Sequence, residues 1–277
     1  MRTGPLLLLT FCFLFFLSHS EAATEIPFEY REGLIWLSVS ATGRAEPLRF
    51  LLDSGAGVSV IDLRAARALG AKLGPTQAVL GVGGRSAAYG VGGIEVRLAS
   101  VPLPHPALAI DLTPVSAACG RRIDGLLGAD FFRAHLVQID FRGKKIRLLS
   151  REEFSRNHGD TLPLVTRGDA LCVRVSVNGQ RPAWVRVDTG CDSALEWVTR
   201  SHGPETLTGT TIAAGPGSRH GVLTTVRLGA LQLDAVPTGL RATPLFPGEA
   251  GLLGNGLLGK FTVTFDAAKG RLLLARN

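Results

Sequence analysis

The sequence predicts an all-β protein made of two similar lobes, and three observations carry this prediction. The chain of 277 residues contains 34 glycines and 15 prolines, a composition typical of many short strands joined by tight turns. Alternating apolar runs such as 34–40 and 171–177 are rich in branched side chains, as strands are. The third observation is an internal repeat, because residues 26–141 recur in the same order within residues 162–267.

The repeat consists of blocks that keep their order while the second copy loses loop residues. Residues 46–55 (EPLRFLLDSG) match residues 181–190 (RPAWVRVDTG). Residues 125–141 match residues 251–267, and both blocks begin with Gly-Leu-Leu-Gly. Chance identities would not keep this order along a whole chain. We therefore expect two lobes of about 125 residues each, related by internal duplication.

Each copy is expected to open with a β-hairpin. In the second copy Asn178-Gly179 stands between two alternating runs, and this dipeptide is the strongest short hairpin signal. The segment 61–74 (IDLRAARALGAKLG) instead predicts about two turns of helix, ended by Gly70 or Gly74.

The first residues have the pattern of a signal peptide. Met1-Arg2 provides a positive start, residues 5–17 are almost entirely apolar, and Ser20-Glu21-Ala22 fits a small-x-small cleavage site. The apolar run is shorter than the 18 or more residues of a membrane span, so we expect export to the periplasm or medium and no span after cleavage. The predicted boundaries are residues 1–22 for the signal peptide, 23–150 for the N-terminal lobe, 151–160 for a polar linker and 161–277 for the C-terminal lobe.

The net charge and the number of cysteines limit which partners and disulfides can be expected. The net charge is +7, but the arginines are scattered singly and no basic tract occurs, so nucleic acid is not an expected partner. Of the four cysteines, Cys12 leaves with the signal peptide. Cys119, Cys172 and Cys191 remain, and either one disulfide with a free thiol or no disulfide is compatible with this number.

The residues with catalytic potential stand where one strand ends in each copy. Asp53 and Asp188 both follow an apolar strand, and each is followed by a hydroxyl residue and a glycine. Glycine permits a sharp turn, and the hydroxyls of Ser54 and Thr189 can hydrogen-bond across to the other loop. Two carboxylates in one site share a proton, so one serves as base and the other as acid on a water molecule. This chemistry needs no metal and no cofactor, and the histidines show no spacing suited to zinc.

These motifs resemble those of the retropepsin-like and pepsin-like aspartic proteases. The resemblance rests on Asp53-Ser54-Gly55 and Asp188-Thr189-Gly190, each followed by an apolar-apolar-glycine element, 126–128 and 252–254. It implies two closed β-barrel lobes with the active site between them, and it covers nearly all of the mature chain. It also implies roles for individual residues: catalysis for Asp53 and Asp188, loop support for Ser54, Gly55, Thr189 and Gly190, and a flap over the substrate for the hairpin with Gly83, Gly84 and Tyr89.

The expected function is that of a monomeric aspartic endopeptidase acting on peptide or protein substrates. Two alternatives stay open. Cys191 and Asp192-Ser193 depart from the family pattern, and Asp192-Ser193 stand where the first copy has Gly57-Val58. One lobe would then be degenerate, leaving a peptide-binding protein of the cell envelope, or a single competent lobe would act in a homodimer.

Overall fold

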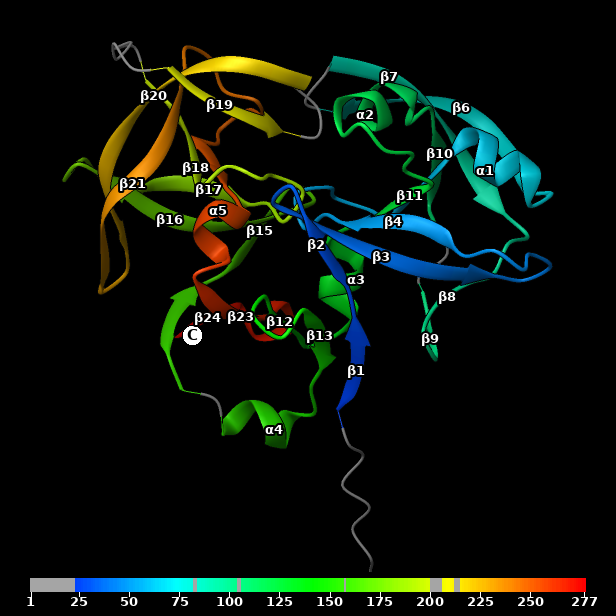
Figure 1. Ribbon diagram of the computed structural model, residues 1–277, viewed down its shortest axis with the longest axis horizontal. Helices are drawn as coiled ribbons and strands as arrows, with labels where there is room; N and C mark the ends of the chain where they lie inside the picture. Colours follow the sequence, from blue (N-terminus) through cyan, green and yellow to red (C-terminus); the bar gives the residue numbers. More distant parts are fainter. Residues whose placement is uncertain (1–22, 82–83, 104–105, 157, 200–205, 212–214) are drawn as a thin grey trace, which may run out of the picture.

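The computed structural model describes residues 23–277 except 82–83, 104–105, 157, 200–205 and 212–214. The protein is mostly β, as predicted, and the strands form three sheets. Figure 1 shows the sheet of residues 29–127 on the right and the sheet of residues 165–253 on the left. We call these sheets, with their helices, the N-terminal and C-terminal lobes. A third sheet lies below and between them, and the predicted signal peptide lies outside the described residues.

The N-terminal lobe is built on a ten-stranded sheet. Its strands are β2 (Glu29–Arg31), β3 (Leu34–Ala41), β4 (Leu48–Leu52), β5 (Val60–Asp62), β6 (Lys72–Gly81), β7 (Gly84–Gly92), β8 (Val96–Leu98), β9 (Val101–Pro102), β10 (Leu108–Ile110) and β11 (Gly125–Leu127). Their order is β6-β7-β10-β5-β11-β4-β3-β8-β9, with β2 paired to β3. Strand β11 is parallel to β4 and antiparallel to β5, so it passes between the strands that precede and follow Asp53.

The C-terminal lobe repeats this arrangement in an eight-stranded sheet. Its strands are β15 (Val165–Arg167), β16 (Ala170–Val177), β17 (Ala183–Val187), β18 (Leu195–Val198), β19 (Thr206–Thr211), β20 (Gly215–Leu228), β21 (Leu231–Arg241) and β22 (Gly251–Leu253). Their order is β15-β16-β17-β22-β18-β21-β20-β19, with a further pairing of β16 to β20. The run β16-β17-β22-β18-β21-β20 corresponds strand by strand to β3-β4-β11-β5-β10-β7. The hairpin predicted at Asn178-Gly179 joins β16 to β17, and both residues have positive φ.

The described strand pairings close only one of the two expected barrels. In the C-terminal lobe the pairing of β16 with β20 completes a six-stranded ring, because β20 and β21 run unbroken along its wall. The matching wall of the N-terminal lobe is interrupted between β7 and β8, where Gly93 has φ +78°, and again between β9 and β10.

The third sheet joins the two halves of the chain and was not expected from the sequence. Its strands are β1 (Thr24–Pro27), β12 (Val137–Asp140), β13 (Lys145–Leu148), β14 (Asp160–Pro163), β23 (Phe261–Asp266) and β24 (Arg271–Arg276). The order is β1-β13-β12-β23-β24-β14, so three strands from each half meet where β12 pairs with β23. The repeated Gly-Leu-Leu-Gly segments thus lead into paired strands of this sheet.

Short helices connect the strands. They are α1 (Leu63–Ala68), α2 (Thr113–Ala118), α3 (Ala129–Ala134), α4 (Arg151–Ser155), α5 (Asn255–Leu258) and the 3-10 turn η1 (Ala267–Lys269). Helix α1 was predicted, and it ends just before Gly70, whose φ is +71°. Helix α4 lies in the expected linker and begins with a capping box of Ser150 and Glu153. None of the helices among the described residues is long and apolar enough to cross a membrane.

The larger of two apolar clusters among the described residues runs through both lobes and the third sheet. Phe131 and Phe132 of α3 are fully buried in it, and the Phe132 ring lies 4.5 Å from the ring of Phe265 in β23. Because α3 directly follows β11, this packing ties the strand that flanks Asp53 to the sheet that joins the lobes. The position of the loop that carries Asp53 is therefore tied to the core.

Candidate active site

Asp53 and Asp188 occupy equivalent positions at the ends of β4 and β17. The backbone N–H of Asp53 donates to the carbonyl of Leu127, and that of Asp188 donates to the carbonyl of Leu253, both at 2.9 Å. These carbonyls end β11 and β22, which run parallel to β4 and β17. The two Gly-Leu-Leu-Gly elements therefore lie beside the two aspartates, as the family resemblance implies.

The carboxyl groups of Asp53 and Asp188 lie next to each other. Their side chains are hydrogen-bonded to each other. Asp53 Oδ1 also accepts from the N–H groups of Gly55 and Ala56, both at 3.0 Å, and Asp188 Oδ1 accepts from the Gly190 N–H at 2.9 Å. The residues are only 8% and 6% exposed. Each loop thus turns back on its own carboxylate and presents it to the other lobe.

The hydroxyl residues bind the two loops together in a symmetric exchange. The Ser54 N–H donates to Thr189 Oγ1 at 2.9 Å, and the Thr189 N–H donates to Ser54 Oγ at 3.0 Å. Each hydroxyl then donates to a carbonyl of the opposite strand, Ser54 to Val187 at 2.8 Å and Thr189 to Leu52 at 2.9 Å. Four buried hydrogen bonds hold the carboxylates on rigid supports, which is what a catalytic pair needs.

Glycines are required at this site by close approach. A Cβ on Gly55 would overlap the carboxyl group of Asp188. Gly128 and Gly254, which end the two Gly-Leu-Leu-Gly elements, press against the backbone after each loop, at Val58 and Ser193. The glycine content noted in the sequence thus includes positions where no side chain fits.

The surroundings of the pair favour a shared proton. Burial raises the pKa of Asp53, with hydrogen bonds from the loop N–H groups and the charge of Arg186 offsetting part of that effect. Burial raises the pKa of Asp188 well above its ordinary value, and the charge of Asp53 raises it further. The pair therefore shares a proton, and the two N–H groups that bind Asp53, against one that binds Asp188, favour Asp53 as the ionised partner.

The departure from the family pattern at Asp192 has a packing explanation. A Cβ on Gly33 would lie 2.7 Å from the Cβ of Asp192, and one on Gly57 would lie 2.5 Å from the Cβ of Asp169. In the repeat Gly33 matches Asp169, and Gly57 matches Asp192. Each of these two contacts between the lobes therefore joins one glycine to one aspartate. The residues that differ between the copies are complementary.

The three remaining cysteines are buried thiols without a disulfide. Burial raises the pKa of Cys119 to about 11 and that of Cys172 to about 12. The pKa of Cys191, next to Gly190, is raised by burial and by the nearby charge of Asp188. A thiol held protonated in this way is a weak nucleophile, so Cys191 does not compete with the carboxylates for a chemical role.

The expected flap corresponds to the hairpin of β6 and β7. Gly84 begins β7 with φ +109°, and Gly83 lies outside the described residues. Tyr89 is half-buried in β7, where it faces Thr76 of β6 and Ala109 of β10. Its position is that of a strand residue, and a role over the substrate stays a prediction.

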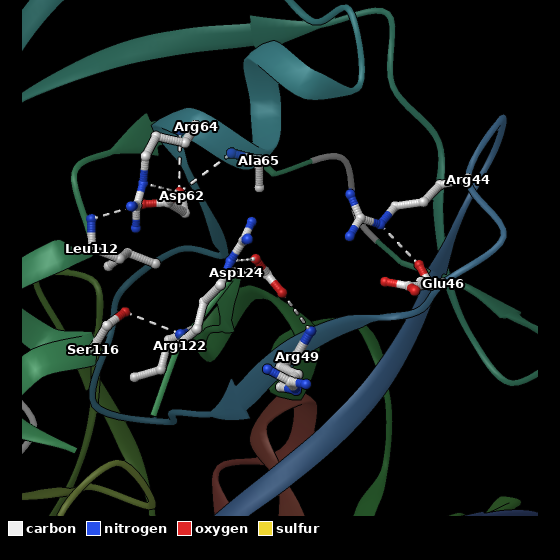
Figure 2. A network of polar contacts seen from close by, with 11 residues as sticks. Arg44, Glu46, Arg49, Asp62, Arg64, Ala65, Leu112, Ser116, Arg122 and Asp124 are labelled. Carbon is white, nitrogen blue, oxygen red and sulfur yellow. Dashed lines mark hydrogen bonds and ion pairs between the residues drawn. The ribbon is translucent and has the colours of Figure 1, made fainter. Parts of the chain in front are cut away.

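Two further buried carboxylates in the N-terminal lobe serve the structure (Figure 2). Asp62 caps α1 by accepting from the Ala65 N–H at 3.3 Å, and its other oxygen accepts from the Leu112 N–H at 3.1 Å. Asp124 accepts from the Arg49 N–H at 3.0 Å and from Arg122 Nε at 2.7 Å. Across the described part of the chain, no three His, Cys, Asp or Glu side chains gather as a metal ion would require.

Comparisons with known proteins agree with this geometry. The sequence model of a family described as Aspartyl protease matches residues 37–131, which include Asp53 and the first Gly-Leu-Leu-Gly element. The resemblance to the aspartic proteases is thereby confirmed. Among solved structures, the aspartic proteinase from Irpex lacteus superposes with a TM-score of 0.60 at 12% identity, covering 92% of this chain and 98% of that one. At this identity the likeness shows the fold alone. Among curated proteins, none matches the sequence significantly.

Sequence reasoning missed one pair of residues at this site. Arg186, two residues before Asp188, is buried and ion-paired with Glu249. The alternating pattern of residues 183–187 places an arginine on the outward face of a strand, and nothing in the sequence connects it to a glutamate 63 positions later.

Proposed function

We propose that this protein is an aspartic endopeptidase that hydrolyses peptide bonds with a water molecule activated between Asp53 and Asp188. The observation that carries the proposal is the hydrogen-bonded pair of buried carboxyl groups, presented by two loops that exchange hydroxyl hydrogen bonds. The family match over residues 37–131 and the two-lobed fold support it.

The reaction follows from the proton that the pair shares. Ionised Asp53 takes a proton from the water as its oxygen attacks the carbonyl carbon of the peptide, and Asp188 gives its proton to the carbonyl oxygen. The resulting tetrahedral diol loses its amine when Asp53 returns a proton to the nitrogen and the C–N bond breaks. One hydroxyl proton goes back to Asp188 as the carbonyl re-forms, so the products are a carboxylic acid and an amine and the pair regains its starting state.

The buried environment suits these roles. Hydrogen bonds from the Gly55 and Ala56 N–H groups favour the ionised form of Asp53, which the attack requires. Both aspartates come from one chain, so the arrangement supports activity in a monomer and does not require the homodimer alternative. Peptide or protein substrates are proposed from the aspartic protease resemblance.

Substitution of each aspartate tests the proposal. Asp53→Asn and Asp188→Asn keep the side-chain size but remove a base or an acid, and each should lower cleavage of a mixed peptide library by at least about 10²- to 10⁴-fold between about pH 3 and 7. Asp234→Asn, the same change at an exposed site in β21, is the matched control and should cleave normally. Cleavage retained by both dyad variants would contradict the assignment, and unchanged peptides that bind without turnover would identify a peptide-binding protein instead.

We also propose export, on the signal-peptide pattern of residues 1–22 alone. Cleavage after Ala22 would leave a chain that begins one residue before β1, so the sheet that joins the lobes would be intact. N-terminal sequencing of the protein recovered from its own cells and their medium tests this. A chain starting at Ala23 would support the proposal, and one starting at Met1 would contradict it.

A further inference from the structure

The two lobes differ at the position two residues before each aspartate. Leu51 of β4 lies opposite Leu126 in the N-terminal lobe, and Arg186 of β17 lies opposite Leu252 in the C-terminal lobe. Leu51 is fully buried in an apolar cluster. Arg186 is 9% exposed, so a charged group stands where the other lobe has an aliphatic one.

Glu249 differs in the same way from its counterpart, Ile123. Each precedes the Gly-Leu-Leu-Gly element by two residues, and the residues after them, Ala250 and Asp124, make the same backbone hydrogen bond to the neighbouring strand. Ile123 is fully buried, and Glu249 is 8% exposed. The C-terminal lobe has therefore exchanged an apolar pair for an ionic one.

The guanidinium of Arg186 is bound on three sides. Its Nε and Nη2 donate to the two oxygens of Glu249 at 2.8 and 2.7 Å, and its carbon lies 3.4 Å from the ring centre of Phe246. The remaining Nη1 donates to the backbone carbonyl of Gly55 at 2.7 Å. This last bond crosses from the C-terminal lobe into the loop that carries Asp53.

A buried ion pair contributes little net stability, because the cost of removing two charges from water offsets their attraction. The Leu51 and Ile123 pair shows that this fold accepts apolar residues at both positions. Stability alone therefore does not account for Arg186 and Glu249. The contact that an apolar pair could not make is the hydrogen bond to Gly55.

We propose that Arg186, held by Glu249, is a positioning residue for the carboxylate pair. By fixing the Gly55 carbonyl, it orients the peptide unit between Gly55 and Ala56, whose N–H binds Asp53, and it places one positive charge beside both carboxyls. The catalytic meaning of this role rests on the proposed function, whereas the effect on the carboxyl groups does not.

The charges around the site determine in which direction the pKa values of the two aspartates should move when Arg186 is removed. The charge of Arg186 lowers the pKa of both aspartates against the effect of burial. The other titratable groups nearby are Glu249, which is paired with Arg186, and two thiols. Cys172 is affected by the charges of Arg186, Glu249 and Arg167, and Cys191 by those of Asp188, Asp192 and Glu196. Removing Arg186 together with Glu249 takes away the nearest cation and its counter-ion, so both carboxyls should bind their protons more tightly.

The decisive variant copies the other lobe. Arg186→Leu with Glu249→Ile should fold, as judged by circular dichroism and a thermal melt, because it recreates the Leu51 and Ile123 pair. We expect kcat to fall about 100-fold with KM little changed, since a small misplacement of catalytic groups has this effect. Both limbs of the pH profile should move to higher pH. Arg186→Lys keeps the charge without the planar fork, so it should lower kcat while moving the profile less.

A second readout separates failure of this proposal from failure of the proposed function. NMR titration of ¹³C-labelled aspartate carboxyls, assigned with Asp53→Asn and Asp188→Asn, reports the pair without any substrate. An upward shift in the double variant supports the role of Arg186 even if no peptide is cleaved. Arg167→Leu removes an exposed charge that stacks on Trp184 at 5.2 Å and should shift neither readout. A folded double variant with unchanged carboxyl titration and unchanged kcat would overturn the proposal.

Discussion

At the scale of single residues, the structure explains why each position of the two tripeptides carries its residue type. The aspartates end strands, the hydroxyls cross to the opposite loop, and Gly55 leaves room for the carboxyl group of Asp188. The hydroxyl exchange is the feature most easily tested, because its two halves are chemically equivalent.

Removing the Ser54 hydroxyl should destabilise the folded protein. Ser54→Ala leaves the Thr189 N–H without its acceptor and the Val187 carbonyl without its donor, both in buried surroundings. Unsatisfied buried groups cost about 1–3 kcal/mol each, so we expect the free energy of unfolding to fall by roughly 2–4 kcal/mol. Denaturant unfolding measures this. Ser54→Thr is the control, because Thr189 already fills the matched position, and equal stability of the Ala and Thr variants would contradict the account.

The sequence predicted these residues well because the motif is local and occurs twice. It could not predict Arg186 with Glu249, since the partner comes from a distant segment and burial is a property of the packed lobe. It also presented Asp192 as a departure from the pattern. Its match to Gly33 across the lobes is visible only once the two copies face each other.

At the scale of elements, the hairpins, α1 and the strands flanking the motifs follow from alternation and turn residues, and these could be predicted. The sheet that joins the lobes could not be predicted, because β12 and β23 pair over more than a hundred intervening residues. The alternating pattern of a strand does not indicate which other strand it pairs with.

Substitutions at the contact between the turn at Asp169 and the loop at Gly57 test how the elements of the two lobes pack together. Gly57→Ala would place a methyl group against Asp169, and overpacking of this kind costs about 1–3 kcal/mol. Adding Asp169→Gly should restore most of the lost stability, because the two residues compete for one space. A double-mutant cycle by denaturant unfolding measures the coupling. Additive effects of the two changes would contradict the proposed packing.

At the scale of the whole molecule, two lobes with the same strand order meet over one site and are joined by a sheet to which both contribute. We propose internal duplication as the origin of this symmetry, on the ordered sequence blocks and the matching strands. The lobes are not identical. Among the described residues, strand pairings close the C-terminal barrel but not the N-terminal one, and beside the site the C-terminal lobe has an ionic pair where the N-terminal lobe has an apolar one. This asymmetry gives the two carboxyls different surroundings, so they can take opposite protonation states.

The pH dependence of kcat/KM for a cleaved peptide, measured on the wild-type protein from about pH 3 to 8, tests the central claim most directly. Asp53 must be ionised, so activity should fall as the pH drops through its pKa. Asp188 must be protonated, so activity should also fall as the pH rises through its pKa, which burial and the charge of Asp53 raise well above the ordinary value. The account predicts a bell-shaped profile with its maximum between these two pKa values. Activity that continued to rise to pH 8 would contradict a shared proton between Asp53 and Asp188.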